Sequence, residues 1–206
     1  MTGVRIYLEG GGDFQDQKAQ LRLGMDAFLA SLKNQVRVKR WKWKLAPCGG
    51  RQNAFEAFQN ARKFSVDGEI IVLLVDAEAP LTAATRAEHL RLRQGDGWDL
   101  TGVPEETIHL MVETMETWIV ADPQALAAYY GQQFNANALP PNINPEQVEK
   151  NSIENALKQA TRATQKGTYQ KIRHASDLLQ RIDPQTVRKK CPNCDRLFQV
   201  LGVLIN

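Results

Sequence analysis

The fold of this chain is decided by residues 70–78, which read Ile-Ile-Val-Leu-Leu-Val-Asp-Ala-Glu. A continuous run of β-branched and leucine residues predicts a strand that is covered on both faces, as at the centre of a parallel sheet. The run is far shorter than the ~20 apolar residues that a membrane-spanning helix needs. It ends in two acidic residues, Asp76 and Glu78. We therefore predict a buried strand that delivers carboxylates to one end of a sheet.

Three more strand-like segments accompany this run. Alternating apolar residues predict a strand over residues 4–8, a stretch rich in valine and tryptophan predicts one over residues 36–45, and a short apolar run predicts one over residues 108–112. Between these segments, apolar residues recur at helical spacing. Strands that alternate with helices predict an α/β domain over residues 1–130, with a mostly parallel sheet of about four strands.

The composition changes after this domain. Residues 131–145 contain three prolines and four asparagines, which predicts a loop or linker. Residues 146–206 show helical periodicity and are expected to form a basic helical appendage packed on the core. An aspartate followed by proline marks a helix start at Asp122 and again at Asp183.

The net charge is small because two unlike halves nearly cancel. The whole chain has 26 Lys and Arg against 23 Asp and Glu, a formal charge of +3. Residues 149–206 hold 11 basic and 5 acidic residues, which leaves 15 against 18 in the rest of the chain. An acidic core would suit a bound metal ion, and a basic tail would suit a bound phosphate. The plainer interpretation is that the charged residues lie on helix faces exposed to solvent.

The cysteines and the N-terminus bear on localisation. The N-terminus lacks the pattern of a secretory signal, so we expect a soluble cytoplasmic protein that contacts no membrane. Three cysteines are an odd number, which favours reduced thiols. Cys191 and Cys194 have zinc-like spacing, but no second Cys/His pair follows them, so reduced structural thiols are the favoured interpretation.

Acidic residues follow three of the four predicted strands, where parallel strands bring residues to one end of the sheet. If strand geometry continues past residue 75, Asp76 and Glu78 point the same way. Carboxylates gathered in one crevice repel one another unless a cation is present, and Mg²⁺ prefers oxygen ligands. The principal candidates are Glu9, Asp76, Glu78 and Glu116, with Asp13 and Glu113 as secondary ones.

Glycines and basic residues supply candidate phosphate contacts. Gly10 and Gly11 would let the backbone approach a phosphate and offer it amide groups. Lys42 and Lys44 alternate with tryptophans in the second strand, a composition that suits a nucleic-acid backbone but equally an edge strand protected against aggregation.

Two residues of the basic tail are further candidates for contacting a phosphate. Lys171 and His174 are three residues apart on a predicted helix, where they would be neighbours. From that helix they could close the crevice over a bound phosphate, although a lone histidine more often has a structural role.

The residues Leu8-Glu9-Gly10 and Leu74-Val75-Asp76-Ala77-Glu78 resemble the Toprim signature of topoisomerases, primases and the overcoming-lysogenization-defect (OLD) nucleases. More closely, nearly the full chain resembles the bacterial Toprim-like family known as domain of unknown function 4276. The segments that carry this closer resemblance are residues 4–13, 115–122, 169–174, 182–184 and 191–198. The resemblance implies a Toprim-like Rossmannoid α/β fold with a C-terminal helical appendage.

The resemblance also implies a function. Asp76, Glu78 and Glu116 would hold one or two Mg²⁺ or Mn²⁺ ions, and Glu9 would ligate metal or act as general acid/base. Related proteins act on nucleic-acid phosphodiesters and are often encoded beside an ABC-type ATPase. Glu78 departs from the family pattern, because most Toprim domains have aspartate at that position.

We therefore expect a metal-dependent nuclease or related phosphodiester-transfer enzyme, as the effector of an ATPase-linked bacterial defence system. The first alternative is a non-catalytic Toprim-fold module that binds a nucleotide or a partner ATPase. The second is a phosphate-ester enzyme that acts on a small nucleotide, which would share the metal site but not the basic strand.

Overall fold

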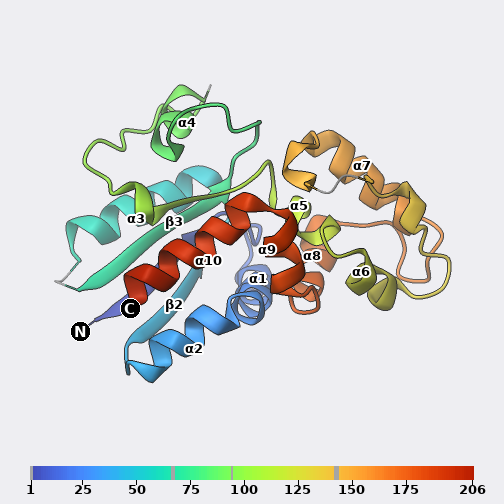
Figure 1. The fold of residues 1–206 in the computed structure, drawn as a ribbon, viewed down its shortest axis with the longest axis horizontal. Helices are drawn as coiled ribbons and strands as arrows, with labels where there is room; N and C mark the ends of the chain where they lie inside the picture. The colour runs from blue at the N-terminus through green and yellow to red at the C-terminus, as the bar shows by residue number, and fades with distance from the viewer. Residues whose placement is uncertain (1, 66–67, 94, 142–143) are drawn as a thin grey trace.

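The computed structural model describes residues 2–65, 68–93, 95–141 and 144–206. Four parallel strands form one sheet in the order β2-β1-β3-β4, with helices on both faces (Figure 1). The strands are β1 (Gly3–Leu8), β2 (Lys42–Pro47), β3 (Glu69–Asp76) and β4 (Ile108–Met111). The predicted α/β fold class is confirmed, and the arrangement is consistent with a Rossmannoid Toprim-like fold.

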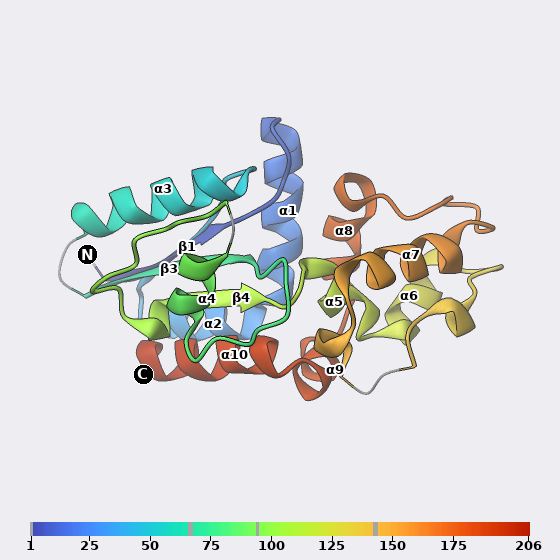
Figure 2. The same cartoon turned by 90° about the horizontal axis from the view of Figure 1, so that it is seen from above.

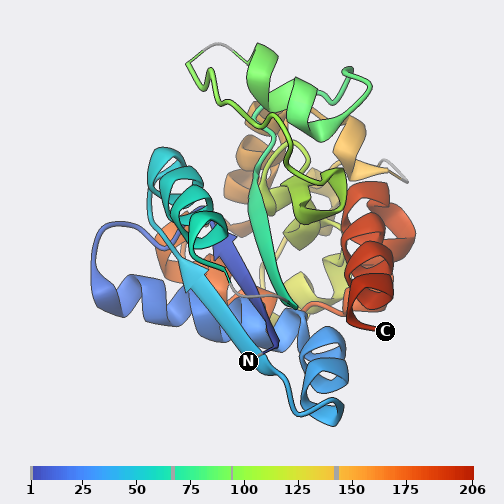
Figure 3. The same cartoon turned by 90° about the vertical axis from the view of Figure 1, so that its left-hand side faces the viewer.

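Two helical layers sandwich the sheet (Figures 2 and 3). The first layer packs against side chains such as Val72 and Leu74 and consists of α1 (Gln15–Phe28), α2 (Ala30–Val38) and α10 (Pro192–Ile205). The second covers Ile71 and Leu73 and consists of α3 (Arg51–Lys63) and α4 (Arg86–Leu92). Neighbouring residues of β3 face opposite layers, and both layers bury them, which explains why residues 70–75 of the strand are all apolar.

The remaining helices lie beyond the carboxyl ends of the strands (Figure 2). They are α5 (Met115–Val120), α6 (Pro123–Tyr130), α7 (Lys150–Thr161), α8 (Lys171–Leu179) and α9 (Pro184–Lys190), with short 3₁₀ helices η2 (Ala136–Ala138) and η3 (Pro145–Gln147). A further short 3₁₀ helix, η1 (Glu105–Thr107), leads directly into the amino end of β4. Helix α8 packs along α1, and α10 packs along α2 and β4. The C-terminal helices thus share the hydrophobic core of the sheet. They also place residues such as Lys150 and Lys171 near the carboxyl ends of the strands.

The second strand starts later than the sequence predicts. Helix α2 continues to Val38, and β2 begins only at Lys42. Val36 is fully buried in the helical layer, so packing overrides the β-preference of valine. The turn is made by Arg40 with a φ of 58°, and no glycine marks it in the sequence.

The predicted helix caps are present. Asp122 accepts a hydrogen bond from the amide of Ala125 at 3.1 Å, and Asp183 accepts one from Thr186 at 3.0 Å. Cys191 and Cys194 are buried at the start of α10, and burial raises the pKa of both thiols. This placement agrees with a structural role for the two thiols.

Across the described ranges, none of the helices combines the length and the apolar character needed to cross a membrane.

His109 gives the fold a pH-dependent stability. Its side chain lies between the sheet and α10, with Nε2 3.0 Å from the carbonyl oxygen of Glu106 and Nδ1 3.2 Å from a guanidinium nitrogen of Arg196. Burial, reinforced by the positive charges of Arg196 and Arg86, lowers the pKa of His109 to about 3. The ring is therefore neutral in the folded state at every pH at which the protein is handled.

We expect this histidine to destabilise the protein in mild acid. The unfolded chain binds a proton at His109 below about pH 6.5 and the folded chain does not, so the free energy of unfolding falls as the pH drops. Between pH 6.5 and pH 5, the wild type should lose about 1.5 kcal/mol more than His109→Gln. Urea unfolding of both proteins at the two pH values measures the difference, and equal losses would contradict the prediction.

Candidate metal centre

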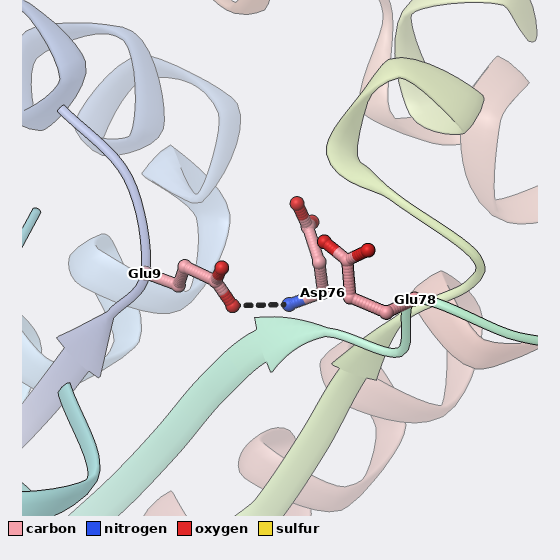
Figure 4. Close-up of side chains that lie close together, drawn as sticks. All are labelled: Glu9, Asp76 and Glu78. Atoms are coloured by element: carbon pink, nitrogen blue, oxygen red, sulfur yellow. Dashed lines mark hydrogen bonds between the residues drawn. The ribbon is translucent and has the colours of Figure 1, made fainter. Parts of the chain in front are cut away.

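Three carboxylates meet at the carboxyl end of the sheet (Figure 4). Glu9 follows β1, Asp76 ends β3, and Glu78 lies two residues further along the chain. One carboxylate oxygen from each of the three lies within 4.8 Å of the others. Oxygen atoms this close suit a hard divalent cation such as Mg²⁺ or Mn²⁺.

The pairing of β1 with β3 accounts for the first two members. Leu8 is in register with Leu74, so Glu9 emerges beside the end of β3. There its Oε2 accepts a hydrogen bond from the backbone N–H of Asp76 at 3.1 Å (Figure 4). The Asp76 carboxylate is fixed in turn by the backbone N–H of Met115, 2.8 Å from its Oδ1.

Glu78 reaches the cluster by a turn and not by continued strand alternation. Strand β3 ends at Asp76, and Glu78 has a φ of 65°, which L-residues other than glycine seldom adopt. Its backbone N–H donates to the carbonyl oxygen of Glu113 at 2.7 Å, which ties the turn to the segment after β4. The expected proximity of Asp76 and Glu78 is thus present, although the reason given for it from the sequence is wrong.

Each of the three acids also contacts a basic side chain from outside β1 and β3. Arg51, the first residue of α3, donates to Glu9 at 3.0 Å and to the carbonyl oxygen of Asp76. Lys171 lies 3.2 Å from Asp76, and Lys150 is hydrogen-bonded to Glu78. The cluster therefore has protein cations around it, and we expect an incoming ion to compete with them.

The pKa values reflect this mixture of burial and charge. Burial raises the pKa of Asp76 to about 7, with the nearby Glu9 and Glu116 adding to the effect and Lys171 opposing it. Burial also raises the pKa of Glu9, which Arg51 offsets only in part. Burial opposes ionisation of Glu78 too, but Lys150 and the neighbouring arginines outweigh it and lower the pKa of Glu78. Burial thus disfavours the charged form of two of the three acids, as expected of a site that a bound cation would complete.

The other predicted acids lie around this cluster. Glu116 is linked to Asp76 through Lys171, whose ammonium is 3.2 Å from both carboxylates, and it accepts the hydroxyl of Tyr169 at 3.1 Å. Glu113 instead accepts the backbone N–H of Lys150 at 3.1 Å and so caps α7. Asp13 is exposed.

The predicted glycines are explained by backbone geometry. Gly10 and Gly11 have φ values of 109° and 89°, which favour glycine. The N–H of Gly10 donates to the carbonyl oxygen of Gly49 at 2.8 Å, and Gly49 donates back at 2.9 Å. The Gly10 amide is therefore used within the protein, which corrects the expectation that it is offered to a phosphate.

The structure does not bring Lys42 and Lys44 to the carboxylates. Lys42 pairs with Gly3, at the amino end of the sheet, which a rise of ~3.3 Å per residue places about 20 Å from Glu9. Strand β2 is an edge strand with both lysines exposed, while Trp43 is half-buried against the core. For Lys42, this geometry favours the alternative in which a lysine protects an edge strand.

The other predicted pair, Lys171 and His174, lies on α8, and the structure places its two members differently. Lys171 reaches the cluster, but His174 is buried against aromatic residues, with Nδ1 accepting the Gln170 N–H at 3.2 Å and lying 3.1 Å from the Tyr130 hydroxyl. His174 thus has a structural position, and the expectation that it closes the crevice over a phosphate is corrected.

Sequence reasoning missed Arg51 and Lys150. Arg51 carries a usable signal, because it follows β2 and two glycines at the same end of the sheet as the predicted acids. Lys150 carries none, since only the fold of the C-terminal helices brings it to Glu78.

A cavity of about 440 Å³ opens beside the cluster. Its lining includes Glu78, Glu116 and Lys171, together with residues of α7 such as Lys150 and residues 169–170. Its volume falls in the range of small-molecule sites, so a nucleotide-sized group fits next to the carboxylates.

The model of one protein family matches residues 8–202, and that family is described as Domain of unknown function (DUF4276). No curated protein and no solved structure matches the chain. The matched span contains Glu9, Asp76, Glu78 and Glu116, together with the cations that contact them.

Proposed function

The chain belongs to the DUF4276 family, and from its site we propose that it is a metal-dependent phosphodiesterase that acts on nucleic acid. The observation that carries this proposal is the convergence of Glu9, Asp76 and Glu78, with carboxylate oxygens within 4.8 Å of one another at the carboxyl end of a parallel sheet. Ligand sites of open α/β sheets lie at this end. The adjoining cavity supports the proposal, because it leaves room for a substrate beside the cluster.

The residues present fit one or two Mg²⁺ or Mn²⁺ ions. Glu9, Asp76 and Glu78 offer carboxylate oxygens, and Glu116 lies one lysine away from Asp76. A divalent ion held there would supply the positive charge that stabilises phosphodiester cleavage. The raised pKa of Glu9 also suits a carboxyl group that takes up or gives a proton, the alternative role for this residue.

Two lysines give the site positive charge of its own. Lys171 and Lys150 line the cavity while contacting the cluster, so each can turn toward a phosphate oxygen of a bound substrate. Phosphate recognition by lysine relies on charge and not on a fixed fork of donors, which tolerates such movement.

One observation favours a second function, that of a non-catalytic module that binds a nucleotide or a partner protein. Glu9, Asp76 and Glu78 each contact Arg51, Lys171 or Lys150, so protein cations balance the acids without a metal. In that case the cavity would bind a ligand and no hydrolysis would follow. The ABC-type ATPase partner and the defence role implied by the family resemblance stay predictions.

Hydrolysis assays separate the two functions. We expect Mn²⁺-dependent cleavage of plasmid, single-stranded DNA or RNA by the purified protein, and loss of cleavage with a chelator. Glu78→Gln should lower the rate about tenfold, because it removes the charge of one ligand from a half-exposed site. Glu56→Gln, an exposed acid on α3, serves as the matched control and should have no effect. Equal inertness of wild type and variants, also with the ATPase added, would favour the non-catalytic function.

A further inference from the structure

A groove runs along the free edge of the sheet, on the side of β2 away from β1. It has a volume of about 700 Å³ and is formed by β2, the second half of α1, and α2. Its lining includes Arg22, Asp26, Arg37, Trp41, Trp43 and Lys44. Neither the metal cluster nor the cavity beside it uses any of these residues.

The groove carries excess positive charge. Among the described residues that line it, the single acid, Asp26, is already engaged by Lys33 and by the indole N–H of Trp43, both at 2.8 Å. In the part of the chain that the structure describes, Arg22, Arg37 and Lys44 form no ion pair with this acid, and all three are exposed. Charge of one sign along a concave surface attracts a polyanion.

Two indoles lie among these cations. Trp43 is held in place by its hydrogen bond to Asp26, and Trp41 is half-buried, with the ammonium of Lys39 5.3 Å from its ring centroid. An aromatic face next to cations that track a backbone is the combination that binds unpaired bases. In a duplex the bases stack on one another, so they are not available to stack on either indole ring.

The groove leads toward the metal cluster. Pro47, at its carboxyl end, is in register with Leu8, the residue before Glu9. Lys18 lies between the groove and the cluster. Its ammonium is close to Gly49, since a Cβ built on that glycine would be 3.5 Å from the ammonium nitrogen. From Trp41 to Pro47 the strand covers about 20 Å at ~3.3 Å per residue, so a bound strand would run along β2 and arrive beside Glu9.

We propose that this groove binds single-stranded nucleic acid and guides it to the metal cluster, an inference that rests on the proposed function and names its substrate. The contacts come from α1 and α2, from Trp41 just before the edge strand, and from Trp43 and Lys44 within it. Lys42, which the sequence pairs with Lys44, is outside the groove lining. A peptide strand added to the free edge of β2 is the competing occupant, and the cations argue against it because they would meet no phosphate.

Fluorescence anisotropy with Asp76→Asn protein tests the groove while cleavage is blocked. The probes are single-stranded DNA and RNA of about ten nucleotides and one sequence, and the corresponding DNA duplex. With three phosphates neutralised, the logarithm of the binding constant should fall by about 2 per tenfold rise in salt. Arg37→Glu and Trp41→Leu should each weaken binding of the preferred single strand about tenfold.

Lys63→Glu, a charge reversal at an exposed position of α3 on the other face, is the matched control and should leave binding within about twofold. Thermal unfolding checks that Trp41→Leu is folded. Tighter binding of the duplex, equal losses for Lys63→Glu and Arg37→Glu, or no binding would overturn the inference. Intact binding without hydrolysis by the wild type would overturn the proposed function alone, whereas hydrolysis that no groove variant affects would overturn the groove alone.

Discussion

Asp76→Asn is expected to lower metal-dependent hydrolysis about a thousandfold while the protein stays folded. Asp76 is the central member of the cluster, because it lies between Glu9 and Glu78 and shares Lys171 with Glu116. Removing its charge takes one ligand from the ion and leaves the other two carboxylates without the group that aligns them. Mn²⁺ affinity should fall about a hundredfold as well.

The substitution is mild for the fold. Asparagine keeps the oxygen that accepts the Met115 N–H at 2.8 Å, and it removes a charge whose burial is unfavourable, as the raised pKa of Asp76 shows. The free energy of unfolding without metal should therefore not fall. Asp99→Asn, at an exposed position, is the matched control. Full activity of Asp76→Asn would contradict a catalytic role for the cluster, and activity lost together with folding would show only a structural role.

Lys171→Met is expected to destabilise the metal-free protein by about 2 kcal/mol and to strengthen Mn²⁺ binding. The Asp76 and Glu116 side chains are only 4% and 7% exposed, and Lys171 contacts both. Removing the ammonium breaks this mostly buried charge network, because two buried carboxylates are left without the positive charge between them and repel each other. The Lys171 side chain is 44% exposed, so solvent screening makes the loss in the free energy of unfolding smaller than for a fully buried lysine.

The diagnostic feature is rescue by metal. A divalent ion can replace the missing positive charge, so Mn²⁺ should restore more stability to Lys171→Met than it adds to the wild type. Chemical denaturation with and without Mn²⁺ measures both effects. Lys158→Met removes a lysine from an exposed pair with Glu154 and should change stability by less than about 0.5 kcal/mol. A Lys171→Met protein that is as stable as the wild type without metal would contradict this account of the charges.

The sequence predicted the parts of the site that depend on strand ends. The apolar run of β3 identified the centre of the sheet, and the rule that parallel strands end together placed Glu9 beside Asp76. The turn at Glu78 could not be foreseen, because its positive φ occurs at a residue other than glycine. What followed from the parallel arrangement of the strands was thus predictable, and what depended on an unusual backbone conformation was not.

The cations were harder to predict because tertiary packing places them. Lys150 lies 72 residues from Glu78 in the sequence, and only the arrangement of α7 over the sheet joins them. Arg22 lines the groove from α1, which the sequence showed only as amphipathic, and Arg37 lines it from α2, whose last residues were predicted as the start of the second strand. The second strand was predicted too early, which assigned helix and turn residues before Lys42 to the sheet.

The split of the net charge now has a partial structural account. Lys150 and Lys171 of the basic C-terminal part contact the carboxylates of the acidic part. The groove cations Arg22 and Arg37, in contrast, belong to the acidic part of the chain. Charge counted along the sequence therefore indicated the pairing at the cluster but not the groove.

The central claim is that Glu9, Asp76 and Glu78 hold a divalent ion, and a crystal soaked in Mn²⁺ tests it most directly. We predict an anomalous density peak between the three carboxylates, at ~2.2 Å from one oxygen of each, with Lys150 or Lys171 turned away from the cluster. Crystals of Asp76→Asn soaked in the same way should lack the peak. No peak in the wild type at millimolar Mn²⁺, with the lysines still bound to Asp76 and Glu78, would contradict the claim.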